Sequence, residues 1–190
     1  MKKFVMVPVL GVSALALAAC GGDEAAGGDA AASADAITAA DVEAAQTAWG
    51  EGIVAIGAVS TEGGDVAARA TEHINTHYGY EDGMEILFKP TLAAEDQFRG
   101  TFDEALSYFI GTEGTEDGGF AIAPYTAVRW ENEGTVIDAD GSTAMAMGNY
   151  YFTGTDGNET KVEYTFGYTK NDDGDLVINL HHSSLPFSAE

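Results

Sequence analysis

The second half of the chain consists of long stretches in which apolar and polar residues alternate, and this pattern constrains the fold more than any other feature. Four such stretches occur, at 125–138, 142–153, 161–170 and 176–184. Each connection between them contains an Asp-Gly pair, which is typical of a tight β-hairpin turn. The second half is therefore predicted to be a meander of four antiparallel strands.

Side chains on a strand point alternately to opposite faces, so these strands are expected to have one buried face and one polar face. The apolar face of the third strand carries Val162, Tyr164, Phe166 and Tyr168. Its other face carries Lys161, Glu163, Thr165 and Thr169. Long strands twist, so the sheet is expected to be strongly curved and to have a concave face that forms a pocket. The predicted apolar walls of this pocket are Met145, Met147, Phe166 and Leu180.

The first half is predicted to be mainly helical. Thr38 with Asp41, and Thr101 with Glu104, have the spacing of capping boxes, and apolar residues recur at helical spacing after each pair. The predicted elements are helices at about 39–59, 66–77 and 102–109 and a short strand at 84–88. Helices followed by a long antiparallel sheet indicate an α+β fold in which the helices cover one face of the sheet.

The chain begins with the features of a bacterial lipoprotein signal peptide. Basic residues precede a short apolar run, and Leu17-Ala18-Ala19-Cys20 resembles the lipobox at which such signals are cleaved. Residues 1–19 are therefore predicted to be the signal, and Cys20 to carry the lipid. Residues 20–36 are predicted to be a lipidated, flexible tether and 37–190 a single domain. We expect the lipid to anchor the protein in the bacterial cell envelope, facing the periplasm.

The charge and the cysteine content of the chain limit which partners and metal sites are expected. The chain has 8 basic and 31 acidic residues, so its surface repels nucleic acids and anionic lipids. The membrane is therefore expected to be a partner only through the lipid anchor. Cys20 is the one cysteine, and its acylation leaves no thiol for a disulfide or a thiolate metal site.

The last predicted strand ends in the polar stretch His181-His182-Ser183-Ser184. Regular alternation puts Ile178, Leu180, His182 and Ser184 on one face and Val177, Asn179, His181 and Ser183 on the other. Each face then carries a histidine, which titrates near neutrality, followed by a serine hydroxyl. Neighbouring residues on a strand do not face each other, which argues against a Ser-His nucleophile pair. The pattern leaves open which pair faces the pocket.

No cofactor is expected, because the chain has no dinucleotide fingerprint, no phosphate-binding loop, no serine-hydrolase elbow and no Cys/His zinc cluster. His73 and His77 have helical spacing, but the Glu that would follow the first histidine of a zinc-protease motif is missing. They are interpreted as two half-exposed helix histidines. A zinc or manganese site formed by this pair with His181 and His182 remains the alternative.

Six stretches of the chain are distinctive when taken together. They are Phe88-Lys89-Pro90-Thr91, Phe98-Arg99-Gly100-Thr101, Ser107-Tyr108-Phe109, Met147-Gly148-Asn149-Tyr150, Lys161-Val162-Glu163-Tyr164-Thr165-Phe166-Gly167-Tyr168 and His181-His182-Ser183-Ser184-Leu185-Pro186-Phe187. In sequence and in order they resemble the signature stretches of the iota-class carbonic anhydrases. The resemblance implies a cone-shaped domain of the nuclear transport factor 2-like superfamily, similar to the calcium/calmodulin-dependent kinase II association domain, that forms a homodimer.

The resemblance also implies an activity, the reversible hydration of carbon dioxide to bicarbonate, with or without zinc or manganese. By motif, the candidate catalytic residues are Thr91, Tyr108, His181, His182, Ser183 and Ser184. In the hypothesis that follows, an imidazole with Tyr108 as its hydrogen-bond partner accepts a proton from water as the water attacks carbon dioxide. Thr91 and a serine hydroxyl then donate to the developing bicarbonate oxygens.

Two other functional classes remain open, because a fold does not fix a function. One is a non-catalytic module that binds a small ligand or forms oligomers. The other is an enzyme resembling steroid isomerases or polyketide cyclases, which needs an acid in the pocket as general base. Glu163 is the candidate for that acid.

Overall fold

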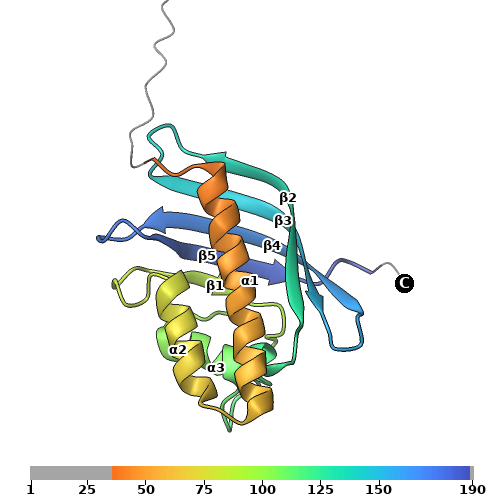
Figure 1. Ribbon diagram of the computed structural model, residues 1–190. Helices are drawn as coiled ribbons and strands as arrows, with labels where there is room; N and C mark the ends of the chain where they lie inside the picture. Colours follow the sequence, from red (N-terminus) through yellow and green to blue (C-terminus); the bar gives the residue numbers. More distant parts are fainter. Residues whose placement is uncertain (1–35, 189–190) are drawn as a thin grey trace, which may run out of the picture. The chain divides into compact units, whose positions relative to one another are not determined.

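The computed structural model describes residues 36–188, so the predicted signal, Cys20 and most of the predicted tether lie outside the described residues. Its elements are α1 (Ala39–Glu62), α2 (Val66–His77), β1 (Leu87–Lys89), α3 (Phe102–Ile110), the 3-10 helix η1 (Phe120–Ile122), β2 (Ala127–Ile137), β3 (Thr143–Thr153), β4 (Glu159–Lys170) and β5 (Leu176–Ser184). Helices precede the long strands, as predicted for an α+β fold (Figure 1). Within the described part, no helix is both long enough and apolar enough to cross a membrane.

The helices begin where the sequence predicts. Thr38 and Asp41 form a complete capping box at the start of α1, because each side chain accepts a hydrogen bond from the backbone N–H of the other residue. Thr101 and Glu104 do the same for α3. Helix α1 continues about one turn past the predicted end and stops at Gly63, whose positive φ of 73° favours a residue without a side chain.

The five strands form one sheet in the order β1-β5-β4-β3-β2. Strands β2 to β5 are the predicted antiparallel meander. The pairing of the short strand was not predicted: β1 pairs with β5 in parallel, with Phe88 opposite His181, so the sheet is mixed. Strand β1 enters the sheet from the helical layer, so no hairpin turn sets its direction. The strong curvature and the cone shape remain predictions.

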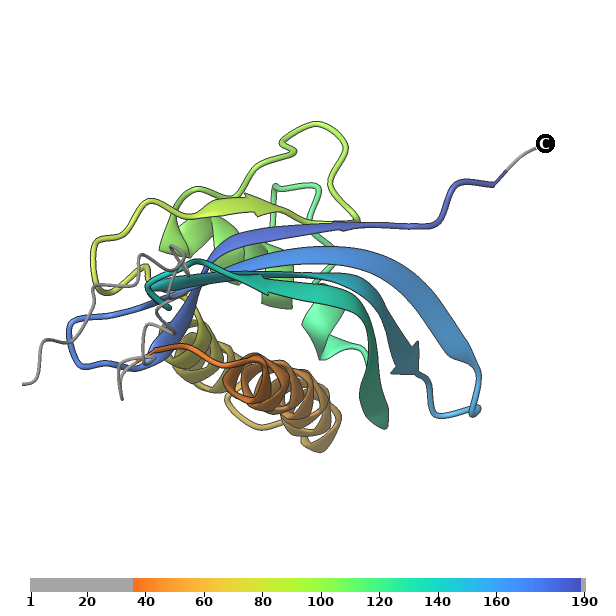
Figure 2. The same cartoon turned by 90° about the horizontal axis from the view of Figure 1, so that it is seen from above.

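The two faces of the sheet differ in what covers them. Helices α1 and α2 lie on one side (Figure 2), where Trp49 of α1 is fully buried among aromatic rings of β2, β3 and β4. The opposite face exposes Val136, Met145 and Met147. The two methionines were predicted to be pocket walls, but they point away from the core because Ala144 and Ala146, which alternate with them, face inward.

A bulge in β5 changes which residues share a face. Gly167 of β4 pairs with Leu180 and the next residue, Tyr168, pairs with Ile178, so Asn179 is an extra residue in β5. Ile178 was predicted to share a face with His182, but the bulge turns it into the core together with His181 and Ser183. Gly167 allows this arrangement, because a Cβ there would lie 2.9 Å from atoms of Asn179 and Leu180.

Candidate active site

A small cavity lies where the ends of β1 and β5 meet α3. Four of the six predicted site residues line it, namely Thr91, Tyr108, His181 and Ser183. Its other lining residues are Leu92, Phe120, Tyr125, Tyr150, Phe152, Thr160, Val162 and Leu185. The volume of about 80 Å³ is enough for two or three molecules the size of water. The sequence therefore predicted residues that meet in space from three separate parts of the chain.

Strand pairing explains why Thr91 lies beside the polar end of β5. Because β1 and β5 run in parallel, their carboxyl ends lie at the same edge of the sheet, and Thr91 follows β1 closely. Tyr108 of α3 is joined to the same loop, since the backbone N–H of Leu92 donates to the Tyr108 hydroxyl oxygen at 3.3 Å.

Ion pairing and hydrogen bonds hold the loop that follows Thr91. Arg99 is 2% exposed, and its guanidinium lies 2.7 Å from Asp117. The Glu116 carboxylate accepts hydrogen bonds from the backbone N–H groups of residues 94–96. These contacts connect the loop to the segment after α3. Arg99 lies within one of the family motifs, but no role was predicted for it.

His181 is buried between aromatic rings. Its ring centroid lies 4.5 Å from that of Phe88 and 4.1 Å from that of Phe166, its partners in the two neighbouring strands. Burial lowers the pKa of His181 well below its usual value, so the imidazole is neutral at neutral pH. The hypothesis that Tyr108 is its hydrogen-bond partner was wrong, because Nδ1 of His181 lies 2.8 Å from the hydroxyl of Tyr78.

The tyrosines of the cavity are neutral too. Burial raises the pKa of Tyr108 to about 12 and that of Tyr150 above its usual range. The Tyr108 oxygen accepts from a backbone N–H, so its own proton is available to the cavity. Tyr125, Tyr150 and Thr160 also line the cavity but were not predicted as site residues. Tyr150 lies within a quoted family motif and on the buried face of β3, whereas Thr160 fell just outside the predicted limits of β4.

His182 and Ser184 lie on the opposite, uncovered face of the sheet. They line an open depression of about 380 Å³ together with Glu163. The Ser184 hydroxyl donates to the Glu163 carboxylate at 3.1 Å. Glu163 therefore does not reach the cavity, which removes the acid that an isomerase-like or cyclase-like mechanism would need there.

Comparison with known proteins identifies the family. Residues 40–185 match a family model described as metal-independent carbonic anhydrase. The chain belongs to the metal-independent carbonic anhydrase family. Membership confirms the predicted enzyme, a carbonic anhydrase of the iota class, and the prediction that it needs no cofactor.

The relatives cover most of the described domain. A metal-independent carbonic anhydrase of Nostoc sp. is 43% identical over 151 residues, which are 77% of this chain and 72% of the relative. The crystal structure of a cyanobacterial iota-carbonic anhydrase complexed with bicarbonate is 40% identical, covers 82% of this chain and 96% of its own, and superposes with a TM-score of 0.77. A structure from Xanthomonas campestris described as a calcium/calmodulin dependent protein kinase II association domain is 18% identical over 80% of this chain and 86% of its own, with a TM-score of 0.49.

The arrangement of histidines agrees with a metal-independent family. His73 was predicted to be half-exposed, but it is buried, because Gly52 of α1 leaves space in which a Cβ would meet the imidazole. His73 and His181 each pack against Trp49, whereas His182 is on the far face of the sheet, so the four-histidine site is not formed. Among residues 36–188, no three His, Cys, Asp or Glu side chains converge as a metal site.

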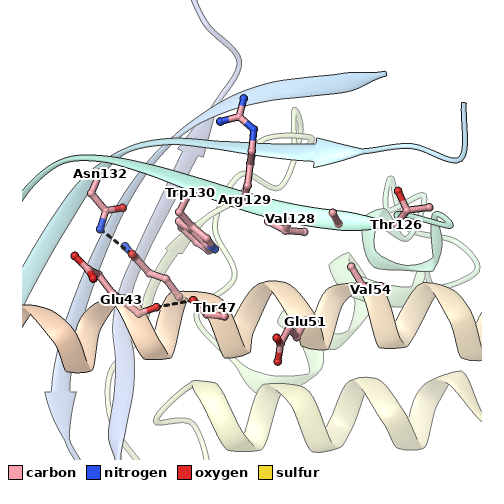
Figure 3. Close-up of a pocket in the computed structure, with 11 residues that line it drawn as sticks. Glu43, Thr47, Glu51, Val54, Thr126, Val128, Arg129, Trp130 and Asn132 are labelled. Carbon is pink, nitrogen blue, oxygen red and sulfur yellow. Dashed lines mark hydrogen bonds between the residues drawn. The ribbon is translucent and has the colours of Figure 1, made fainter. Parts of the chain in front are cut away.

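A larger groove of about 710 Å³ lies between α1 and β2 of this carbonic anhydrase (Figure 3). It contains none of the motif residues. Its amides are already paired, since Asn132 donates to Gln46 at 2.9 Å, and the guanidinium of Arg129 is bound by Glu131 and Glu159. The groove is larger than the cavity, but its two amides and its guanidinium already have partners in the protein.

Proposed function

We propose that this chain hydrates carbon dioxide reversibly to bicarbonate in the 80 Å³ cavity. One observation supports the proposal above the others: motif residues from three separate parts of the chain, Thr91, Tyr108 and His181 with Ser183, line one small cavity. A relative 40% identical to this chain forms a complex with bicarbonate, which has the size and hydrogen-bonding capacity that the cavity suits.

Hydration of carbon dioxide forms one carbon–oxygen bond and releases one proton. The oxygen of water forms a bond to the carbon of carbon dioxide, a π electron pair moves onto one of the carbon dioxide oxygens, and the water loses one proton. Hydroxyl groups of Thr91, Ser183 and Tyr108 donate hydrogen bonds to the oxygens that become negative. Apolar and aromatic neighbours strengthen these hydrogen bonds, because they exclude bulk water.

Stopped-flow measurement of carbon dioxide hydration tests this function. The protein is chelated exhaustively, analysed for metals and assayed before and after addition of zinc or manganese. We expect the rate to be the same in all three conditions. Activity that appears only with a metal would overturn the metal-free mechanism. If the protein showed no activity in any of these conditions, the non-catalytic binding module would be favoured instead.

The anchoring and location are proposed from the N-terminal sequence. Cleavage before Cys20 and acylation of its thiol would place the domain on the periplasmic side of a bacterial membrane, at the end of a tether of residues 20–36. Replacement of Cys20 by Ala is expected to move the protein from the membrane fraction to the soluble fraction and to abolish incorporation of labelled palmitate. Unchanged fractionation and labelling would contradict the anchor.

A homodimer is proposed over the uncovered face of the sheet. Val136, Met145 and Met147 are each more than half exposed there, and a cluster of apolar side chains at the surface is typical of a protein interface. Sedimentation equilibrium at micromolar concentration is expected to give twice the mass of the chain. A monomer at that concentration would contradict the proposal.

A further inference from the structure

Three buried side chains form a hydrogen-bonded chain that ends at the cavity. The indole Nε1 of Trp49 lies 3.0 Å from the Tyr78 hydroxyl oxygen, and that oxygen lies 2.8 Å from Nδ1 of His181. None of the three residues is more than 2% exposed. No functional role was predicted for Trp49 or Tyr78 from the sequence.

The chemistry of the three groups fixes the direction of the chain. An indole N–H can only donate, so the Tyr78 oxygen accepts from Trp49. The hydroxyl proton of Tyr78 is then best placed on the line to Nδ1 of His181, which must accept it. If Nδ1 donated instead, the Tyr78 proton would be left in the core without an acceptor, which buried hydroxyls avoid.

We propose that Tyr78, oriented by Trp49, is a positioning residue that holds His181 in the tautomer protonated at Nε2, so that His181 donates a hydrogen bond into the cavity. The inference rests on the proposed function for the identity of the group that receives this hydrogen bond. Nε2 is buried, and in the described part of the chain it has no protein partner. The rings of Phe88 and Phe166 restrict the imidazole to the plane in which this geometry is kept.

This tautomer changes the role expected of the histidine. A neutral imidazole that donates through Nε2 stabilises an oxygen as it becomes negative, as the hydroxyls of Thr91 and Ser183 do. It keeps its proton during the reaction. The proton lost by the attacking water therefore passes to a water or buffer base in the solvent, and carbon dioxide and water give bicarbonate and that proton.

Nitrogen NMR of the 15N-labelled protein measures the tautomer directly, without any substrate. Long-range proton-nitrogen correlation distinguishes a protonated ring nitrogen from an unprotonated one, and the His181 signals are assigned by their loss in His181→Gln. We expect unprotonated Nδ1 and protonated Nε2 in the unaltered protein. A protonated Nδ1 would overturn the proposal, even if Tyr78 variants fail to fold.

The variant Tyr78→Phe removes one oxygen and leaves the ring in place. We expect His181 to lose its single tautomer and kcat for hydration to fall about tenfold, while KM changes less than twofold. The matched control is Tyr164→Phe, which also removes a hydroxyl from a buried network, with Gln46 and Asn132, that does not contact His181. We expect the control to keep both the tautomer and kcat.

The outcomes separate this inference from the proposed function. If Tyr78→Phe keeps the Nε2-protonated tautomer and full kcat, Tyr78 does not position His181 and the inference fails, while the function stands. If the unaltered protein shows the expected tautomer but hydrates no carbon dioxide, the function fails, and with it the group that His181 was inferred to bind.

Discussion

The two faces of β5 carry the same two residue types in the same order and have different surroundings. On the inner face, His181 and Ser183 are at most 3% exposed, line the cavity and lie among aromatic rings. On the outer face, His182 is exposed and Ser184 donates to a carboxylate at the surface. A histidine followed by a serine hydroxyl is therefore not a site by itself.

The difference comes from what covers each face. Helices and aromatic side chains exclude water from the inner face, so burial keeps the His181 imidazole neutral and Tyr78 binds one of its two nitrogens. Within a single chain, none of the described elements covers the outer face, where His182 and Ser184 line an open depression. The same substitution made on each face of β5 tests whether the two faces differ in function.

The largest effect is expected from filling the cavity. Ser183→Leu replaces the hydroxyl oxygen with three carbon atoms in a space of about 80 Å³, so we expect carbon dioxide hydration to fall at least a hundredfold. Ser184→Leu adds the same atoms to the open face, and its rate is expected to stay within twofold of the unaltered protein. Stopped-flow assays with circular dichroism as a control for folding measure both. Equal losses in the two variants would remove the distinction between the faces.

Removing the hydroxyl alone should have a smaller effect in the same direction. Ser183→Ala deletes one donor to the developing negative oxygen, and we expect kcat to fall about tenfold to a hundredfold. Ser184→Ala deletes only the surface hydrogen bond to Glu163 and is expected to change kcat less than twofold. The ratio of the two kcat values is the measurement. A ratio near one would show that Ser183 does not contact the reacting atoms.

Substitutions on the outer face are expected to change the oligomeric state and not the rate of hydration. Met147→Glu places a charge in the exposed apolar cluster, so the proposed dimer should dissociate while hydration per chain persists. The matched variant Met147→Leu keeps the side chain apolar and should remain dimeric. Sedimentation velocity at several concentrations compares them. Unchanged mass for Met147→Glu would place the interface elsewhere.

The smallest effect concerns the dependence of stability on pH. The pKa of His181 is lowered in the folded state, so below about pH 6.5 the unfolded chain binds the proton and the folded chain does not. Its contribution to stability is complete above that pH and is lost as the pH falls, by about 1.4 kcal/mol per pH unit. Between pH 6.5 and 5, His181→Gln should reduce the slope of the unfolding free energy against pH by up to about 1.4 kcal/mol per pH unit, which is the contribution of one proton. An unchanged slope would contradict a neutral, buried His181.

Much of the fold follows from local sequence patterns. The Asp-Gly pairs predicted three hairpins, and Gly141, Gly157 and Gly174 indeed have positive φ angles at those turns. The capping boxes at Thr38 and Thr101 predicted the starts of two helices. Each of these signals depends on interactions between residues only a few positions apart, so a short stretch of sequence contains its physical cause.

What the sequence could not predict depends on contacts between distant residues. The extra residue Asn179 in β5 is accommodated by Gly167 on the neighbouring strand, and regular alternation therefore placed Ile178 on the wrong face. The parallel pairing of β1 with β5 could not be predicted either, because no hairpin turn in the sequence joins the two strands. Family motifs predicted Thr91, Tyr108, His181 and Ser183, whereas the contact of Tyr78 with His181 joins residues 103 positions apart.

The most direct test compares His181→Gln with His182→Gln in metal-analysed, chelated protein by stopped-flow carbon dioxide hydration. We expect the first variant to lose at least thirtyfold in kcat, because a buried donor at the cavity is removed. We expect the second to stay within twofold of the unaltered protein, because its side chain is on the uncovered face of the sheet. Full activity in His181→Gln, or loss of activity only in His182→Gln, would contradict catalysis in the inner cavity.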